Sequence, residues 1–388
     1  MRVAFVYPDL SRKGGAENVV VWSAAGLGSR GHEVALLTGA FDPRLWPEGP
    51  ALEGTVRPLP EGAGAFTGFD VVHPHNREAL LATRGCGLPR LWFCHEPWRR
   101  LHLTATDAEL LAAVPSKKVE PHHPAVDQVR RWRRRQTRWP WRRAAHRRAL
   151  ARERREVSRL EGVLVQSHYN ARSFEKAFRR RPAVIDLGVP DPRVPGPAAG
   201  EPPAVRRGIA VNAGGNPKKN LYGVLAAARE LERGGALAEE RFEIWGAGSD
   251  AAAFQDLLRA WDLGSRVRLH GFLPDARARE LLQTARLCLF LPLCEPFGLV
   301  AVEALLLETP LLASDHGGPA EIVGRTGGGW SVDPLRTATV AGALERLLRN
   351  DAALRRRGKL GAVRARSLFG MQDFLVRLEQ RLEACARG

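Results

Sequence analysis

Two glutamates eight residues apart, Glu295 and Glu303, are the residues whose types and spacing first indicate chemistry. They bound the sequence EPFGLVAVE, which follows an apolar run typical of a strand and contains Gly298 at the expected start of a helix. Free N–H groups at such a helix start bind anionic ligands, and carboxylates accept hydrogen bonds from sugar hydroxyls. Taken alone, the spacing favours a simpler interpretation, in which Glu295 caps the helix and Glu303 lies on its solvated face.

A second stretch, TPLLASDHGGPAEIV at residues 309–323, changes this interpretation. With it, the sequence from Arg266 to Val323 resembles the family 4 glycosyltransferases, whose E-x7-E motif is followed by a strand of the type G-T-P-V-I and a G-G-x-x-E-I turn. The sequence GFLP at residues 271–274 fits the same pattern, and a looser resemblance extends over nearly the whole chain. The resemblance implies an α/β GT-B fold, in which two Rossmann-like, doubly wound domains face each other across a cleft. It also implies that the acceptor binds the first domain and that a nucleotide-sugar donor binds mainly the second.

The same resemblance implies roles for the residues of the E-x7-E motif. Glu303 is expected to bind the ribose of the donor. Glu295 is expected to hold the transferred sugar and its phosphate, together with the backbone of Phe297, Gly298 and Leu299. We therefore count Glu295 among the expected catalytic residues.

Cations for the diphosphate follow the first expected strand of the second domain, in the sequence NPKKN at residues 216–220. Lys219 resembles the family's lysine that contacts the diphosphate as a point charge, so we assign it catalytic and donor-binding roles, with Lys218 beside it in the donor site. The family usually carries an arginine five positions before this lysine, where this chain has Gly214. Unless the phosphate is held differently, the cations that compensate are to be sought among Lys218, Arg12 and Lys13. Two solvated lysines at a helix start are the plainer alternative.

In the first domain, two features at strand ends are candidates for the donor site. Gly14 and Gly15 follow the first expected strand and open a helix, where their N–H groups can approach a phosphate, and their position matches the family's glycine-rich loop. A turn also needs glycine for its backbone alone. His95 ends a later strand, where the family often has a histidine that hydrogen-bonds a hydroxyl of the donor sugar, and we assign it a catalytic role. Across unrelated proteins, a lone histidine of this kind is more often structural.

We expect no metal and no cofactor besides the nucleotide-sugar substrate. His73 and His75 form a pair, as do His122 and His123, but no carboxylate or cysteine cluster accompanies either pair at ligand spacing. None of the 15 aspartates lies two positions from another, so the D-x-D pattern that holds a divalent ion on a diphosphate is absent from the sequence. The charge of the leaving group is then to be balanced by Lys219 and by N–H groups at helix starts.

The expected reaction transfers a hexose-type sugar, with retention of configuration, from a nucleotide-diphosphate sugar to a hydroxyl of a glycan, glycolipid or other acceptor, as in polysaccharide biosynthesis. By the resemblance, it proceeds through front-face attack and an oxocarbenium-like state. The composite motif disfavours an epimerase, and the length of 388 residues disfavours a phosphorylase. The alternative is a catalytically idle GT-B scaffold that binds an anionic membrane or nucleic acid through its arginines, an alternative that Gly214 keeps open.

The elements that must position these residues are short apolar runs that alternate with helical patterns, as is typical of parallel sheets flanked by helices. The expected strands are Val3–Tyr7, Val34–Thr38, Val71–His75, Leu91–His95, Val163–Ser167 and Val184–Leu187 in the first half, and Ile209–Ala213, Phe242–Trp245, Val267–Leu269, Leu287–Leu291 and Leu311–Ser314 in the second. Six prolines in 14 residues separate the halves and exclude a helix or central strand there. We therefore expect a first domain at 1–189, a linker at 190–207, a donor domain at 208–370 and a C-terminal helix at 371–388 that crosses back to the first domain.

The positive charge of the chain is concentrated in one segment. Lys and Arg number 59 against 42 Asp and Glu, a net charge of +17, and 14 arginines with two glutamates between Arg130 and Arg159 supply +12 of it. Arginine interleaved with tryptophan suits an anionic lipid surface. The residues expected to contact such a surface, or the acceptor, are Trp132, Arg133, Arg134, Arg138, Trp139, Trp141 and Arg142. A surface helix that is rich in arginine through genomic composition is an equal alternative, and nucleic acid comes third because no binding motif accompanies the charge.

The remaining composition bounds the class of protein. Hydrophobic residues make up 44% and charged residues 26% of the chain, which is ordinary for a folded α/β enzyme and excludes a disordered chain or a rod. Five scattered cysteines without a C-x-x-C pair favour a reducing compartment. The N-terminal apolar run is too short for a signal peptide, and no stretch reaches the ~20 residues that span a bilayer. We therefore expect a cytoplasmic protein, peripheral on the inner face of the membrane if the arginine segment binds lipid.

Overall fold

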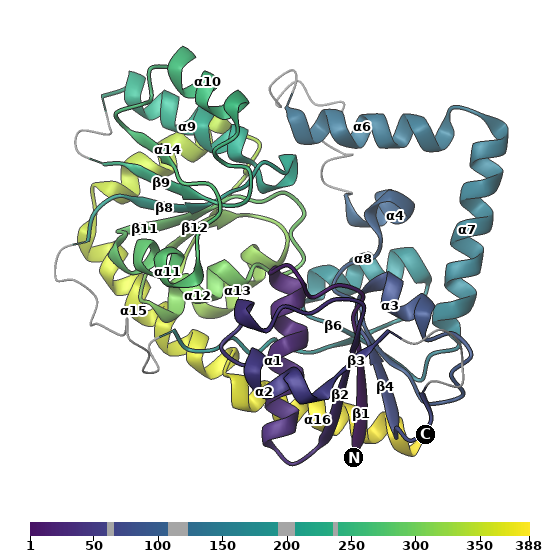
Figure 1. Cartoon of the computed structure of the whole chain (residues 1–388). Coiled ribbons are helices and arrows are strands. Elements are labelled where there is room, and N and C mark those ends of the chain that lie inside the picture. The colour runs from purple at the N-terminus through teal and green to yellow at the C-terminus, as the bar shows by residue number, and fades with distance from the viewer. Residues whose placement is uncertain (60–65, 108–122, 193–205, 236–239) are drawn as a thin grey trace. The chain divides into compact units, whose positions relative to one another are not determined.

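The computed structural model describes residues 1–59, 66–107, 123–192, 206–235 and 240–388 of the chain. The chain divides into two compact units (Figure 1). Unit 1 comprises Met1–Thr106, Gln136–Gly188 and Met371–Gly388, and unit 2 comprises Asp107–Arg135 and Val189–Gly370. Each unit has a parallel sheet and a hydrophobic core of its own.

Unit 1 forms a parallel sheet because its short apolar runs are joined by segments long enough to return the chain to the same edge. Its strands are β1 (Arg2–Val6), β2 (Glu33–Thr38), β3 (Val56–Pro58), β4 (Val71–Pro74), β5 (Leu91–Phe93), β6 (Gly162–Val165) and β7 (Ala183–Val184). The order is β3-β2-β1-β4, and bridges from Val72 to Arg90 and from His75 to Phe93 continue it to β5-β6-β7.

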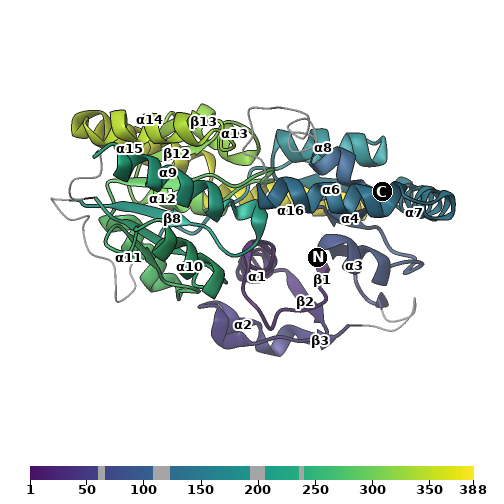
Figure 2. The same cartoon turned by 90° about the horizontal axis from the view of Figure 1, so that it is seen from above.

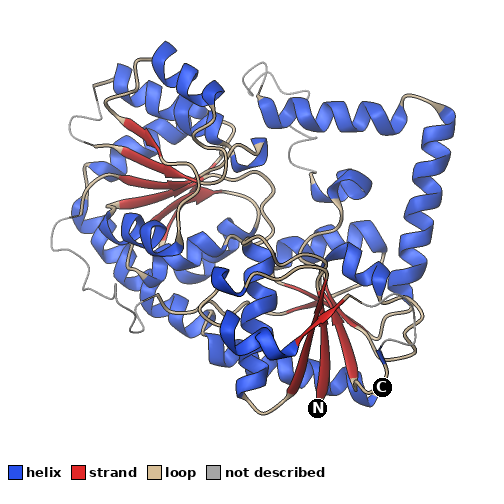
Figure 3. Ribbon diagram, in the orientation of Figure 1, coloured by secondary structure: helices blue, strands red, loops and turns tan. Residues whose placement is uncertain are grey.

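Unit 1 also contains helices, several of which flank this sheet (Figure 3). They are α1 (Gly15–Ser29), η1 (Pro43–Leu45), α2 (Gly49–Leu52), η2 (Glu53–Thr55), α3 (Asn76–Ala82), α4 (Arg99–Thr106), α7 (Pro140–Ser158), α8 (His168–Phe178) and α16 (Met371–Arg387). α16 packs against α1, β4 and β5, so the C-terminal helix belongs to unit 1, as expected. Glu379 of α16 pairs with Arg30 and with His32, which holds the helix in place.

Unit 2 also contains a parallel sheet, which has six strands. They are β8 (Ile209–Asn212), β9 (Phe242–Trp245), β10 (Val267–Leu269), β11 (Leu287–Phe290), β12 (Leu311–Ser314) and β13 (Gly329–Val332), in the order β10-β9-β8-β11-β12-β13. The helices are α6 (Pro124–Thr137), which begins in this unit, η4 (Pro217–Lys219), α9 (Leu221–Arg233), α10 (Ala252–Ala260), α11 (Asp275–Thr284), α12 (Leu299–Leu306), α13 (Gly318–Thr326), α14 (Thr337–Leu348) and α15 (Asp351–Leu368). Helices lie on both faces of the sheet (Figure 2).

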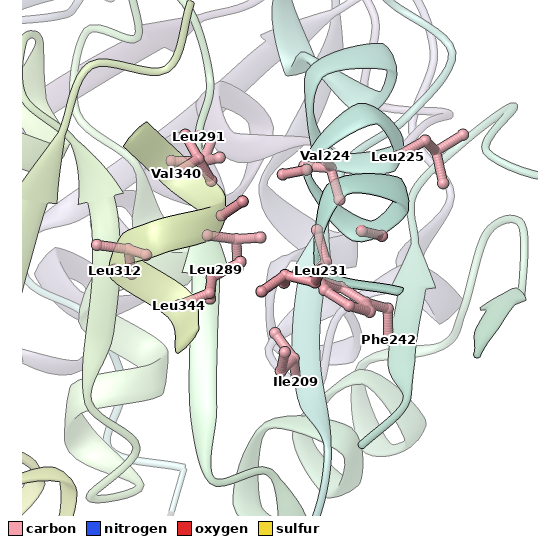
Figure 4. Close-up of a cluster of buried hydrophobic side chains, with 14 of the residues drawn as sticks. Ile209, Val224, Leu225, Leu231, Phe242, Leu289, Leu291, Leu312, Val340 and Leu344 are labelled. Carbon is pink, nitrogen blue, oxygen red and sulfur yellow. The ribbon is translucent and has the colours of Figure 1, made fainter. Parts of the chain in front are cut away.

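The core of unit 2 lies between its sheet and the helices α9 and α14. Phe242 and Leu289 project from the strands toward Val224 and Leu231 of α9 and Leu344 of α14 (Figure 4). All five side chains are at most 2% exposed. The central strands β11 and β12 are buried at every position, so their sequences are continuous apolar runs, which is why they could be predicted.

The fold of the described residues differs from the sequence-based expectations in two respects. It contains two strands that we did not predict, β3 and β13, which lie at sheet edges, where a strand needs fewer apolar residues. It also groups Asp107–Arg135 with unit 2, although this range lies inside the first domain that we predicted at 1–189. Among the described helices, none is both long and apolar enough to cross a membrane.

Candidate functional site

The candidate site of unit 2 lies where the strand order of the sheet reverses. β8 pairs with β9 on one side and with β11 on the other. Loops that leave the carboxyl ends of two such strands diverge to opposite faces and leave room for a ligand. The loop after β8 carries η4, and the loop after β11 carries Glu295. The lysine motif and the E-x7-E motif are therefore brought together at this position.

Lys219 and Glu295 are the side chains that meet there. Lys219 Nζ lies 2.9 Å from Glu295 Oε2, and the two side chains are 37% and 21% exposed. Leu293 N donates to Lys218 O at 2.7 Å, which fastens the two loops through their backbones. An ammonium that attracts phosphate and a carboxylate that accepts from hydroxyls are thus adjacent and partly exposed.

The two glycines of the G-G-x-x-E-I turn support the backbone of Glu295. Gly318 N donates to Glu295 O at 2.8 Å. A Cβ on Gly317 would lie 2.7 Å from that same oxygen, and its φ of 83° also favours glycine. Gly298 has a φ of 97°, and a Cβ there would lie 2.7 Å from the ring of Phe290. Gly298 of the E-x7-E motif and the two glycines of the turn are therefore required for close packing around the Glu295 loop.

The helix α12 positions the rest of the motif. Phe297, just before the helix, is buried with its ring centroid 5.7 Å from that of Phe369. Leu299 and Glu303 are half-buried, and no described side chain caps the helix start. Burial, and secondarily the charge of Glu303, raises the pKa of the Cys288 thiol on β11. Glu303 therefore stands close to the strand that carries the Glu295 loop.

Lys218 is engaged differently from our prediction, which placed it at the donor. It is only 7% exposed, and its Nζ forms an ion pair with Oδ1 of the fully buried Asp107. The same nitrogen lies 5.6 Å from the ring centroid of Trp132 on α6. A buried ammonium requires such partners because an unpaired charge is very costly to desolvate. Asp107 and Lys218 lie 111 positions apart in the sequence, so no local pattern could predict their ion pair.

Asn220 organises the same loop, although we did not predict it as a site residue. It is fully buried with a left-handed φ of 58°, a conformation that asparagine tolerates better than most residues. Its Oδ1 accepts from His123 Nε2 at 2.9 Å, and its Nδ2 donates to Pro334 O at 3.0 Å. Lys219 therefore lies between two residues with fixed partners. The available sequence signal was an asparagine immediately before a helix.

Gly214 stands where the family usually has an arginine, and its surroundings account for this departure. A Cβ on Gly214 would lie 2.7 Å from Ala247 O, and a Cβ on Gly246 would lie 2.9 Å from Gly214 N. Gly215 N also donates to Ala247 O at 2.9 Å. The loops after β8 and β9 thus pack backbone against backbone, which leaves no space for a side chain at position 214.

The reversal of strand order in unit 1 lies between β1 and β4. Gly14 and Gly15 follow β1 and begin α1, which has no side-chain cap. Tyr7 Oη donates to Glu17 Oε1 at 2.7 Å. Burial, reinforced by Glu17, raises the pKa of Tyr7, and the Glu17 carboxylate approaches Gly14 so closely that a Cβ there would collide with it. The helix start that we expected to face a phosphate is therefore present, with a carboxylate beside it.

His95 follows β5 and belongs to a group of three histidines. Its Nε2 lies 3.0 Å from Nδ1 of His75, and its ring centroid lies 4.7 Å from that of Phe93. Burial lowers the pKa of His95 to about 3 and that of His73 to about 4, so both are neutral near pH 7.

We predicted His95 from the sequence but considered His73 and His75 only as metal ligands. The part of the chain that the structure describes contains no group of three or more residues suited to a metal ion, and His122 lies outside the described residues.

The helix α7 is held to unit 1 by the two glutamates of the arginine-rich segment. Glu153 accepts from His102 Nε2 and Arg77 Nε, each at 2.7 Å, and is 2% exposed. Glu156, 6% exposed, pairs with Arg90 at 2.6 Å. Exposed arginines on the same helix are Arg142, Arg143, Arg147, Arg148, Arg152 and Arg155. The acidic side chains thus face the domain, and most arginines face outward.

Two tryptophans are exposed at the start of this helix. Trp139 and Trp141 are 42% and 64% exposed, and their rings stack with centroids 4.9 Å apart. Arg138, also exposed, lies over Trp139. Arg133 and Arg134 on α6 are exposed as well, whereas Trp132 is half-buried beside Lys218. Trp132 therefore packs within unit 2, in contrast to the surface role that we predicted.

Residues 209–362 match the family model described as Glycosyl transferases group 1. Over 117 residues the chain is 33% identical to the alpha-1,3/1,6-mannosyltransferase alg-2 of Neurospora crassa, which covers 30% of this chain and 25% of that protein. Over 171 residues it is 31% identical to the glycogen synthase of Mycobacterium tuberculosis, which covers 44% of this chain and 41% of that protein. The matches thus span less than half the length of these curated relatives.

Solved structures resemble the whole chain, and two of them illustrate the likeness. The sucrose-phosphate synthase of Thermosynechococcus elongatus has a TM-score of 0.70 at 18% identity and covers 99% of this chain and 98% of its own. HepE of Anabaena, in complex with UDP-glucose, has a TM-score of 0.70 at 15% identity and covers 99% of this chain and 100% of its own. The predicted α/β fold with two Rossmann-like domains, GT-B, is confirmed.

Proposed function

Since the chain belongs to the family 4 glycosyltransferases of the GT-B fold, we propose that it transfers a hexose-type sugar from a nucleotide-diphosphate sugar to a hydroxyl of a glycan, glycolipid or other acceptor. The proposed transfer retains the configuration at the anomeric carbon and needs no metal. The complexes of HepE with UDP and UDP-glucose support a nucleotide-sugar donor.

The observation that carries this proposal is the contact between Lys219 and Glu295 at the strand reversal of unit 2. Chemistry at a diphosphate needs a cation for the leaving group and acceptors for the sugar hydroxyls, and this contact supplies one of each. The uncapped start of α12 directly follows the Glu295 loop and adds N–H groups that attract anions. Gly14 and Gly15 offer a second uncapped helix start, in unit 1.

In the proposed reaction, the bond between the anomeric carbon and the diphosphate oxygen breaks while a bond to the acceptor oxygen forms on the same face. The departing phosphate oxygen takes the proton of the acceptor hydroxyl. Lys219 and the helix-start N–H groups stabilise the charge that develops on the diphosphate. Glu295 holds the sugar, Glu303 holds the ribose, and neutral His95 hydrogen-bonds a sugar hydroxyl.

A panel of UDP-, GDP- and ADP-sugars tests the proposal. We expect one donor to raise the melting temperature and to be hydrolysed or transferred, because binding to the native state alone stabilises it. Glu295→Ala is expected to abolish turnover, while Glu345→Ala, on the outer part of α14, serves as the matched control and keeps it. A parent chain that binds donors but turns none over would favour the idle scaffold instead.

We further propose that the acceptor lies at an anionic membrane, which the outer side of α7 contacts. The support is the inward placement of Glu153 and Glu156, which leaves an outer side of arginines with the stacked Trp139 and Trp141 at one end. Each cation near such a surface adds about 1 kcal/mol, and tryptophan favours the headgroup region.

Co-sedimentation with vesicles of anionic and of neutral lipid tests this second proposal. The chain is expected to sediment with anionic vesicles only, less so at high salt. Replacement of both Trp139 and Trp141 by alanine is expected to weaken binding, and Phe272→Ala, which removes a 63% exposed aromatic side chain of unit 2, is expected to leave it unchanged. Absence of binding to anionic vesicles at low salt would reject the proposal.

A further inference from the structure

Three histidines share one face of the unit 1 sheet with two phenylalanines. Side chains two positions apart on a strand lie on the same face, which groups His73 with His75 and Phe93 with His95. The strand register places Phe5 opposite His73 and Phe93 opposite His75. Ring centroids are 4.4 Å apart for His73 and His75, 5.1 Å for His75 and Phe93, and 4.7 Å for Phe93 and His95. The rings form a packed column that ends at His95.

The hydrogen bonds of this column restrict where the ring protons lie. His73 Nδ1 is 2.6 Å from Leu91 O, and this nitrogen must carry the proton because a carbonyl only accepts. His75 Nδ1 and His95 Nε2 are 3.0 Å apart, so one of them donates and the other accepts. Burial lowers the pKa of both His75 and His95, so each ring carries a single proton.

The surroundings of the other nitrogen of His75 decide between the two arrangements. His75 Nε2 is fully buried and has no hydrogen-bond partner among the described residues. If His95 donated, the proton of His75 would be on Nε2, and a buried N–H would have no acceptor. If His75 donates from Nδ1, Nε2 is an unprotonated nitrogen packed among rings. Orphaned buried N–H groups are the rarer case in proteins, so we favour the second arrangement.

We propose that His75 is a positioning residue, which donates its Nδ1–H to Nε2 of His95 and thereby fixes the proton of His95 on Nδ1. That nitrogen has no hydrogen-bond partner among the described residues and becomes the donor to a hydroxyl of the transferred sugar. The backbone of His95 is also held, because Gln166 Nε2 and Asn170 Nδ2 donate to its carbonyl at 2.6 and 3.0 Å. The substrate part of this inference rests on the proposed function, whereas the proton assignment rests on unit 1 alone.

Nitrogen NMR of the full chain labelled with 15N-histidine tests the proton assignment, since protonated and unprotonated ring nitrogens have distinct chemical shifts. We expect His95 to have a protonated Nδ1 and an unprotonated Nε2. In His75→Phe, which keeps an aromatic ring but removes the donor, His95 is expected to become a mixture of tautomers. A protonated Nε2 of His95 in the parent chain would overturn the inference, whatever the enzymatic activity.

Kinetics test the consequence for catalysis. His75→Phe is expected to lower kcat/KM for the donor about 3- to 10-fold, as for loss of one hydrogen bond. His75→Asn is expected to restore most of it, because the asparagine amide nitrogen takes roughly the position of Nδ1. His73→Asn, the matched control in the same column, is expected to keep both the kinetics and the tautomer of His95.

Unchanged kcat/KM in a folded His75→Phe would refute the positioning role. A parent chain inactive with every donor would instead refute the proposed function, and the NMR result would still decide the proton assignment.

Discussion

At the residue scale, Lys219 and Glu295 neutralise each other in the free protein, and each can bind a different group of a ligand. Their separation of 2.9 Å compensates both charges before any ligand binds. Each group is partly exposed, so the pair contributes little to the stability of the fold. A ligand with phosphate and hydroxyl groups offers each of them a new partner, which makes the pair a preformed but adjustable site.

A prediction at this scale concerns the removal of the Lys219 ammonium. Lys219→Ala is expected to lower kcat about 100-fold with a smaller effect on KM, because the charge on the diphosphate is largest in the transition state. Lys359→Ala, on the exposed side of α15, is the control. Steady-state kinetics with the donor found by the thermal-shift panel measure both variants. A kcat equal to that of the parent would contradict the assignment of Lys219.

The buried histidines provide a prediction about pH. The pKa of His73 is lowered to about 4 in the folded chain, whereas an unfolded histidine titrates near 6.5. The unfolded state therefore binds more protons between these values, and stability is complete above about pH 6.5 and falls as the pH decreases toward 4. Urea unfolding across this range is expected to show the decline. In His73→Asn, which does not titrate, the slope is expected to be shallower, and an unchanged slope would rule out His73 as its source.

At the scale of elements, the structure links a segment of the first half of the chain to the lysine loop. Asp107 pairs with Lys218, His123 bonds to Asn220, and α6 places Trp132 beside Lys218. These contacts hold the two residues that flank Lys219, Lys218 and Asn220. The position of Lys219 thus depends on residues about 100 positions earlier in the chain.

Asp107→Ala is expected to destabilise unit 2 by about 3–5 kcal/mol, because it leaves the buried ammonium of Lys218 without its carboxylate. The double variant with Lys218→Met is expected to recover much of this loss, since an apolar side chain of similar length needs no partner. Chemical denaturation of the two variants measures the difference. Equal destabilisation of the single and double variants would contradict the importance of the ion pair.

At the scale of the whole molecule, the chain returns to unit 1 at its end. α16 buries Phe374, Leu375, Leu378 and Leu382 in this unit. α16 lies so close to α1 at Gly26 that a Cβ on this residue would lie 2.5 Å from the side chain of Leu375. Unit 1 is therefore completed only by the last 18 residues of the chain.

The last prediction concerns this helix. Leu378 is fully buried, and Leu378→Ala is expected to lower the stability of unit 1 by about 2–5 kcal/mol through loss of burial and the cavity that remains. Val376→Ala, at a position that is 37% exposed, is the matched control and is expected to change stability by less than about 1 kcal/mol. Thermal or urea unfolding compares them. A loss no greater than that of the control would mean that α16 does not complete the core.

The amino-acid sequence by itself determined the alternation of strands and helices and the two motifs that contain Lys219 and Glu295. These features are local: strands buried on both faces are continuous apolar runs, and the motifs are contiguous in the chain. The proline-rich linker that we predicted at 190–207 lies mostly outside the described residues. All eleven strands that we predicted are present in the described residues. The edge strands β3 and β13 escaped prediction because a partly exposed strand lacks such a run.

The tertiary structure decided which side chains meet. It placed Lys218 in an internal pair with Asp107, made Asn220 the anchor of the lysine loop, and joined His75 to His95. It also showed that position 214 lies against the backbone of a neighbouring loop, so that only glycine fits. None of this is encoded in spacing, because the partners lie 20 to 111 positions apart and are brought together by the order and packing of strands.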